Sequence, residues 1–243
     1  MHQGRPEITV CIATRNHAQY LVEALESLRR QTLAAEQFEV VVIDDGSTDE
    51  TPRLLMRWVS WVHVVSRGHR GLAASCNEGL GLARGRYFAR MDSDDIVEPT
   101  WLTQMADTLG QASGACLAYP DRLEMDAVST RPVAASAENI YSLEACGTLF
   151  RTDVLKDIGG FRSFFWEEYD LYLRLLKAGP WVHVPAPLYV YRKHRAGMTA
   201  AAPDRLDGWL ELAREWGAAA LLAAGSNAEM EQALGILERK ALG

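Results

Sequence analysis

The chain has 243 residues, of which 48% are hydrophobic and 23% charged, as in an ordinary soluble globular protein. Its formal net charge of -7 argues against a nucleic-acid binder, because such proteins carry a basic patch. There is no signal-peptide pattern and no apolar stretch near the roughly 18 residues that a membrane span needs. Four cysteines without C-x-x-C spacing are typical of reduced, packed thiols. We expect a cytoplasmic protein, with at most a peripheral contact at the inner membrane face.

Strand and helix patterns alternate through the first half of the chain. Apolar, partly β-branched runs predict four strands, at residues 8–13, 38–43, 62–65 and 86–91. Apolar residues at helical spacing predict helices over residues 18–31, 54–58, 72–82 and 99–109. This order predicts an α/β protein with a mostly parallel sheet and helices on both faces. The stretch 121–140 is polar and is expected to be irregular, and order resumes at 147–150 and 154–158.

The second predicted strand ends in two adjacent carboxylates, Asp44 and Asp45, followed by Gly46. Open α/β sheets place their ligands at the carboxyl ends of the strands. We expect both acids to lie outside the core, because paired acids are rarely buried without partners. A turn followed by a helix that Ser47 or Asp49 caps would account for the next residues but not for the two acids.

The fourth predicted strand ends in Asp92-Ser93-Asp94-Asp95. Three carboxylates within four residues repel one another unless a positive charge lies among them. Mg²⁺ or Mn²⁺, which takes oxygen ligands and bridges carboxylates to substrate phosphates, is the simplest such charge. The two acidic strand ends therefore predict one crevice for a divalent cation and a phosphorylated ligand. For Asp95 the alternative is the N-cap of the helix that follows.

Six segments in order resemble the family 2 glycosyltransferases, which have the Rossmann-like GT-A fold, use nucleotide sugars, depend on a metal and invert the anomeric carbon. The segments are the first strand and its polar end (9–16), the acidic turn (44–49), the stretch around Asn77 (77–87), the DxD triplet (92–94), the acidic motif (167–171) and a closing basic motif (191–194 with 198–199). Each motif alone is a weak signal, but six in the right order are specific. The resemblance covers roughly residues 6 to 200.

The resemblance implies a set of residues that contact the nucleotide-sugar donor. They are Ala13, Thr14, Arg15, Asn16, Asp44, Asp45, Asn77, Asp92, Ser93, Asp94, Arg192 and His194. Asp45 would accept the imide N–H of uracil or thymine, so a UDP- or dTDP-linked sugar is the expected donor, and Asp44 would orient the loop or the ribose. Arg15 stands where relatives often have Tyr, and its guanidinium can stack on a base. The alternative is a solvated Arg15 with Asn16 capping the next helix.

The resemblance also implies a metal site and a catalytic base. Asp94, Asp92 and His194 would hold Mn²⁺ or Mg²⁺ against both phosphates, which stabilises the charge that develops on the leaving group. A lone His is otherwise more often structural. The base is expected in the acidic motif, at Glu168 or its neighbour Glu167. Glu168 aligns with the family's base, where relatives carry Asp; the alternative makes both acids first-turn charges of a helix.

The end of the chain differs from the rest in composition. Residues 1–203 are expected to form the GT-A catalytic domain, and the Ala- and Leu-rich residues 204–243 a helical extension. We expect a helical hairpin packed on the catalytic domain, with Trp209, Leu212 and Trp216 as its apolar stripe. The alternative is a face for homodimerisation or for a membrane surface. Gly197-Met198-Thr199 suggests a loop that orders over the bound donor.

The acceptor is not named by any motif. A glycan, a lipid-linked intermediate or another hydroxyl acceptor fits, and its contacts are expected from residues 120–165. A nucleotide-binding GT-A module without activity is one other function class, although both the DxD and the acidic motif are present. A sugar nucleotidyltransferase is another, but it would carry a Gly-rich basic loop where this chain has Ala13-Thr14-Arg15-Asn16.

Overall fold

A computed structural model describes residues 4–194, residue 197 and residues 205–241. Within these residues one nine-stranded sheet has the order β3-β2-β1-β4-β8-β6-β9-β5, with β7 paired to β6. The strands are β1 (Ile8–Thr14), β2 (Phe38–Asp45), β3 (His63–Arg67), β4 (Tyr87–Asp92), β5 (Ile96–Val97), β6 (Leu117–Met125), β7 (Thr130–Val133), β8 (Leu149–Arg151) and β9 (Trp181–Arg192).

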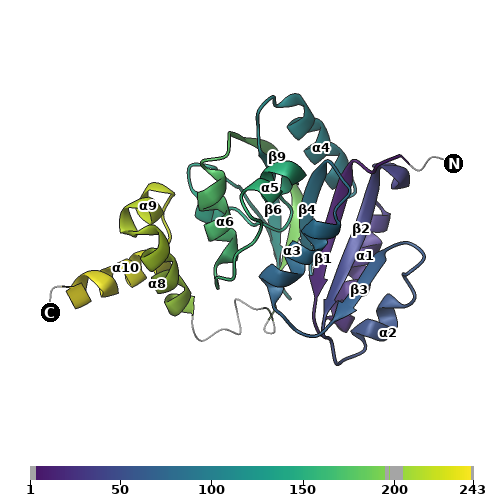
Figure 1. Ribbon diagram of the computed structural model, residues 1–243, viewed down its shortest axis with the longest axis horizontal. Helices are drawn as coiled ribbons and strands as arrows, with labels where there is room; N and C mark the ends of the chain where they lie inside the picture. Colours follow the sequence, from purple (N-terminus) through teal and green to yellow (C-terminus); the bar gives the residue numbers. More distant parts are fainter. Residues whose placement is uncertain (1–3, 195–196, 198–204, 242–243) are drawn as a thin grey trace.

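Helices cover the sheet and extend beyond it (Figure 1). They are α1 (Ala18–Arg29), α2 (Thr51–Leu55), α3 (Leu72–Leu82), α4 (Trp101–Gln111), α5 (Thr152–Asp157), α6 (Glu167–Leu175), α8 (Arg205–Trp216), α9 (Ala218–Ala223) and α10 (Ala228–Ala241), with 3-10 turns η1 (Ala35–Gln37) and η2 (Ile140–Ser142). None of the helices in the described part of the chain has the length and apolarity needed to cross a membrane.

The four strands predicted from sequence are neighbours and run parallel. β1 lies between β2 and β4, and β3 pairs with β2. The short β8 is antiparallel to both β4 and β6, whereas β9 runs parallel to β6. Because β1, β2 and β4 point the same way, their carboxyl ends meet at one edge of the sheet. The prediction of a mostly parallel sheet with helices on both faces is confirmed.

Alternate residues of the parallel strands pack into two separate cores, as the pleat of a strand requires. Val10 and Ile12 of β1 face the core that contains the apolar sides of α1 and α4. Cys11 faces the opposite core, which contains α3 and α6. At Gly79 of α3, an added Cβ would lie 2.2 Å from the Cys11 sulfur. Only glycine therefore lets α3 approach β1 this closely.

Two parts of the sheet differ from the sequence prediction. The prediction that residues 121–140 are irregular is wrong, because this stretch holds the end of β6 and the whole of β7, which form a hairpin. Asp126 closes that hairpin by accepting the backbone N–H groups of Val128 and Ser129, both at 2.8 Å. The long strand β9 was not predicted either. It contains Pro185 and Pro187, which are atypical of strands, and its pairing with β6 is irregular there.

The C-terminal extension packs on the rest of the molecule beside α6 (Figure 1). Trp209 of α8 is 1% exposed and stacks on Tyr169 of α6, with ring centroids 5.1 Å apart and planes 13° apart. The hydroxyl of Tyr141 donates to the carbonyl of Leu221 at 2.7 Å. The first predicted helix is divided at Gly217, whose φ of 80° is disfavoured for other residues. Residues 205–241, the described part of the extension, therefore form three helices, not two.

We predict that Trp209→Ala lowers the free energy of unfolding by about 3–5 kcal/mol, because it empties a large buried site. The matched control is Leu222→Ala on α9, where the side chain is 54% exposed. A surface change of this kind should alter stability by about 0.5 kcal/mol or less. Urea unfolding followed by fluorescence and circular dichroism measures both. Equal effects of the two substitutions would contradict the packing of the extension on α6.

Candidate functional site

A cavity of about 640 Å³ opens at the carboxyl ends of β1, β2 and β4. Ten of the predicted site residues line it: Ala13, Thr14, Arg15, Asp45, Asp92, Ser93, Asp94, Glu168, Arg192 and His194. The other four, Asn16, Asp44, Asn77 and Glu167, do not reach its surface in the described structure. The acidic strand ends therefore share one cavity, as the sequence predicted. The four residues that do not reach its surface make contacts with neighbouring segments instead.

Asn16 joins the ends of β1 and β2. It has a positive φ of 57°, a conformation that Asn tolerates better than most residues. Its side-chain oxygen accepts the N–H of Thr48 at 2.8 Å, and its own N–H donates to the hydroxyl of Ser47 at 3.0 Å. The interpretation of Asn16 as a helix cap is wrong: Asp49 accepts the first N–H groups of both α1, at Ala18, and α2, at Thr51.

Asp44 and Asp45 are buried, at 3% and 4% exposure, contrary to the expectation that they lie outside the core. Their burial is possible because backbone groups satisfy them. Asp44 accepts the N–H of Ser47 at 3.0 Å. Asp45 accepts the N–H groups of Arg70 and Gly71, both at 2.8 Å, and pairs with the Nδ1 of His69 at 2.7 Å.

These contacts keep Asp45 ionised and fix the loop after β3. Burial alone would raise the pKa of Asp45, but the hydrogen bonds from Arg70, Gly71 and His69 outweigh it and lower the pKa. The far nitrogen of His69 lies 3.2 Å from the guanidinium of Arg15. Asp45 therefore positions a loop that, through His69 and Arg15, forms one wall of the cavity.

The turn after β4 carries the predicted metal ligands. Asp94 contacts the Nε2 of His194 at 2.8 Å, and Asp92 accepts from the guanidinium of Arg90 at 3.0 Å. Ser93 pairs with the Nδ1 of His17 at 2.7 Å. His17 also lines the cavity and was missed, since its proximity to Ser93 arises only in the folded chain.

Asp95 is buried behind this turn and accepts from the Tyr189 hydroxyl at 2.7 Å and the Arg192 backbone at 2.8 Å. Its interpretation as a helix cap is wrong, because Thr100 occupies the cap position of α4. Burial, together with Asp92 and Asp94, raises the pKa of Asp95 well above its usual range. Ionisation of Asp95 is therefore disfavoured while the other two carboxyl groups of the turn lie beside it.

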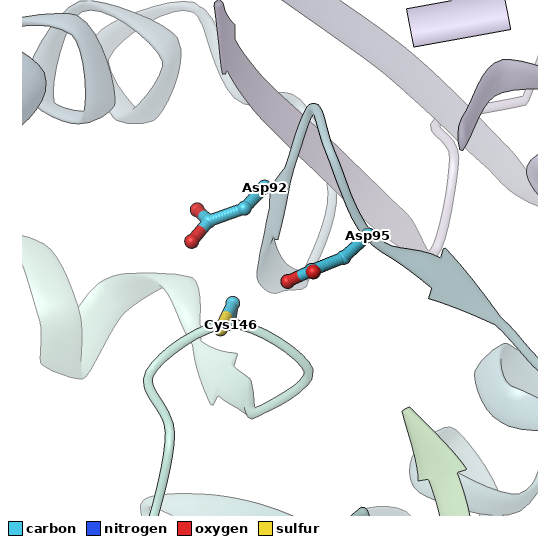
Figure 2. Close-up of side chains that lie close together, drawn as sticks. All are labelled: Asp92, Asp95 and Cys146. Atoms are coloured by element: carbon cyan, nitrogen blue, oxygen red, sulfur yellow. The ribbon is translucent and has the colours of Figure 1, made fainter. Parts of the chain in front are cut away.

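Asp92, Asp95 and Cys146 point toward one another, with one possible ligand atom of each within 4.8 Å (Figure 2). Burial and the nearby carboxylates raise the pKa of the Cys146 thiol, so the thiol stays protonated and is a poor ligand for a hard cation. The carboxylates suit Mg²⁺ or Mn²⁺. The Nε2 of His194 contacts Asp94, and its Nδ1 is buried without a hydrogen-bond partner among the described residues. Asp92 and Asp95 thus offer carboxylates to a divalent cation, whereas the predicted set of Asp92, Asp94 and His194 does not form such a compact group.

The end of β9 closes the cavity over this turn. Arg192 donates from Nε to the Asp94 carbonyl at 2.8 Å and from its terminal nitrogen to Glu23 at 2.6 Å. His194 lies against Tyr20 of α1, with ring centroids 4.7 Å apart. Met198 and Thr199, predicted as part of a loop over the donor, lie outside the described residues.

The acidic motif starts α6, where its two glutamates face different surroundings. Glu167 is buried and contacts the Arg90 guanidinium at 2.5 Å. Glu168 lines the cavity and makes no side-chain hydrogen bond to a described residue. Burial, with Glu167 and Glu144 nearby, raises the pKa of Glu168 well above the ordinary value. Glu168 is the member of the pair that has its carboxyl group available to a ligand.

Asn77 has a supporting position. Its side chain donates to the carbonyl of Phe161 at 2.7 Å and accepts the N–H of the same residue at 2.8 Å. Both ends of the amide thus hold α3 against the segment between α5 and α6.

Sequence reasoning missed further cavity residues, among them Glu144, Tyr191, Lys193 and Arg205. Tyr191 and Lys193 stand inside the recognised basic motif, which was a usable signal. Glu144 belongs to a stretch without periodicity, and Arg205 begins α8, so no local pattern indicated either.

Comparisons with known proteins agree with this geometry. The family model described as glycosyl transferase family 2 matches residues 9–165. Chondroitin synthase of Escherichia coli is 27% identical over 192 residues, which are 74% of this chain and 28% of that protein. The succinoglycan biosynthesis protein ExoO of Rhizobium meliloti is 36% identical over 135 residues, 55% of this chain and 38% of that protein. The chain thus spans well under half the length of these curated relatives.

Solved structures show the fold. TarS 1-349 of S. aureus in complex with UDP-GlcNAc has a TM-score of 0.71 at 20% identity, with 86% of this chain and 66% of that chain covered. The mannosyltransferase PcManGT from Pyrobaculum calidifontis in complex with GDP-Man and Mn²⁺ has a TM-score of 0.69 at 19% identity, with 98% and 76% covered. The expected GT-A fold is confirmed.

We predict that Arg90→Leu lowers the free energy of unfolding by about 3–5 kcal/mol, because it leaves Glu167 buried without its counter-ion. Adding Glu167→Leu should restore part of that loss. The control is Arg53→Leu, whose partner Glu50 and own side chain are 64% and 65% exposed. Loss of that exposed pair should cost about 0–1 kcal/mol. Equal losses at Arg90 and Arg53 in urea unfolding would contradict the role of the buried pair.

Proposed function

We propose that this chain, which belongs to glycosyl transferase family 2, is a glycosyltransferase that moves a sugar from UDP or dTDP to an acceptor hydroxyl with inversion of the anomeric carbon. The observation that carries this proposal is one cavity lined both by the acidic turn after β4 and by Glu168 of α6. The first can hold a diphosphate through a cation, and the second can take a proton.

The donor's nucleoside is assigned to the wall formed by Arg15, Asp45 and His69. A carboxylate has about four acceptor positions, and Asp45 uses three of them on His69, Arg70 and Gly71. The remaining one can accept the imide N–H of uracil or thymine, which guanine would not offer in the same place. TarS, with UDP-GlcNAc, supports this choice, whereas PcManGT was solved with GDP-Man, so the nucleotide must be tested.

The diphosphate is assigned to the turn after β4. Asp92, Asp94 and His194 are the proposed ligands of Mn²⁺ or Mg²⁺, and PcManGT, of the same fold, was solved with Mn²⁺. When bound, the cation supplies positive charge to the diphosphate as it leaves. Arg192 lies at the same turn through its bond to the Asp94 carbonyl, and its charge adds to that stabilisation.

The base is assigned to Glu168. Its ionised carboxylate takes the proton of the acceptor hydroxyl while the hydroxyl oxygen forms a bond to the anomeric carbon and the bond to the diphosphate breaks. A single displacement of this kind inverts the configuration. Glu167 positions α6 through Arg90 and does not reach the cavity. The apolar and acidic surroundings of Glu168 raise its pKa, which strengthens it as a base.

We predict that UDP with Mn²⁺ raises the melting temperature of the protein and that GDP raises it less. A ligand at 100 times its Kd stabilises the native state by about 2.7 kcal/mol. Asp94→Ala should remove the Mn²⁺-dependent part of the shift and nearly all turnover, while Asp107→Ala, at an exposed position on α4, should change neither. Tighter binding of GDP would overturn the choice of nucleoside, and full activity of Asp94→Ala in EDTA would overturn the metal site.

We predict that Glu168→Gln lowers turnover about 10²–10⁴-fold. Affinity for UDP, measured by calorimetry, should stay within about twofold, because the loss is confined to the transition state. Glu167→Gln should be milder.

The same group sets the pH dependence. Because the base must be ionised and its pKa is raised, the wild-type rate should climb with pH through a value above the ordinary glutamate pKa of about 4.3. Glu168→Gln should lose this acid limb. If Glu168→Gln is active and Glu167→Gln is inactive, the assignment of Glu168 is wrong and the base is Glu167.

A further inference from the structure

Glu144 is the second glutamate that lines the cavity, besides Glu168, and it belongs to none of the recognised motifs. Its side chain is 24% exposed. The backbone carbonyl of Glu144 accepts hydrogen bonds from the hydroxyls of Tyr172 at 2.8 Å and Thr148 at 2.9 Å. Tyr172 follows Glu168 by one helical turn, so both side chains lie on one face of α6. The segment that carries Glu144 is therefore attached to the face of α6 that carries the proposed base.

The carboxylate of Glu144 has acceptor capacity to spare. Its one charged partner among the described residues is Arg122, at 3.5 Å, and Arg122 is held more closely by Glu124, at 3.0 Å. No hydrogen bond to the Glu144 side chain is present among the described residues. Glu144 and Glu168 line the same cavity. Burial, Glu167 and Glu144 together raise the pKa of Glu168.

Two basic residues that line the cavity with Glu144 already have acidic partners. Lys193 pairs with Glu124 at 2.6 Å, a carboxylate that Arg122 and Arg131 share, and Arg205 pairs with Glu229 at 2.8 Å. Glu144 and Glu168 are the glutamates of the cavity whose side chains make no hydrogen bond to a described residue. A sugar offers hydroxyl donors to such free acceptors.

We propose that Glu144 binds a second hydroxyl of an acceptor sugar, beside the hydroxyl that Glu168 deprotonates. The inference rests on the proposed function and adds the acceptor's chemical class and a residue that selects it. Glu144→Ala is a suitable test, because Arg122 keeps its closer acidic partner, Glu124 at 3.0 Å.

The experiment measures UDP release from UDP-glucose and UDP-N-acetylglucosamine with Mn²⁺, first in water alone and then with methyl glycosides of glucose, galactose, N-acetylglucosamine and glucuronic acid. Wild type should release UDP slowly in water and faster with a glycoside that the site accepts. In Glu144→Ala the KM for that glycoside should rise about tenfold or more, as expected for a lost hydrogen bond to a charged group. Release in water involves no acceptor sugar, so it should fall less than release with the glycoside.

Two further variants sharpen the result. Glu144→Gln keeps a hydrogen-bond acceptor and should fall between wild type and Glu144→Ala. Glu138→Ala changes an exposed acid of the same stretch and should behave as wild type.

Two results overturn the proposal: equal loss of release with and without glycoside, or an unchanged KM in Glu144→Ala. Release in water without stimulation by any glycoside overturns the sugar class of the acceptor. Absence of UDP release from wild type under every condition, together with no thermal shift by UDP and Mn²⁺, is a distinct result, because it refutes the donor assignment on which the inference depends.

Discussion

The buried guanidinium of Arg90 connects the two halves of the site. It contacts Asp92 at the end of β4 and Glu167 at the start of α6, residues 75 positions apart in the chain. Burial would lower the pKa of Arg90, but the two carboxylates raise it well above its usual range, so the charge is permanent. The turn proposed to bind the cation and the helix that carries Glu168 are thus held at a fixed separation by one side chain.

The wall assigned to the nucleoside is built differently, from backbone groups held by side chains. Asp45 gathers the N–H groups of the loop after β3, and Asn16 does the same for the turn after β2. The desolvation cost of burying the Asp45 carboxylate is offset here, because backbone N–H groups donate hydrogen bonds to it. Loops fixed in this way, one after β3 with His69 and one after β1 with Arg15, present these side chains to a ligand without first having to become ordered.

The parallel half of the fold was predictable because the information for it is local. Continuous apolar runs identify β1, β2 and β4, and helical spacing identifies α1 and α3, whose predicted bounds 72–82 agree with the structure. In β9 the prolines at 185 and 187 hide the strand, and charged residues such as Arg131 hide β7.

The candidate site divides in the same way. Residues within motifs, such as Asp94 and Glu168, were found and line the cavity, whereas the contact of His17 with Ser93 spans 76 residues. Such a contact depends on how elements pack, which no local pattern records. The buried partners that satisfy Asp44 and Asp45 were missed for the same reason.

The contact between Gly79 and Cys11 has a consequence for how the protein can diverge. A side chain at position 79 would collide with the sulfur of Cys11, 2.2 Å from the new Cβ. Alanine at position 79 therefore becomes acceptable only together with a smaller residue at position 11. The two positions, 68 residues apart, should change together among homologues. Their covariation would record the short distance between α3 and β1.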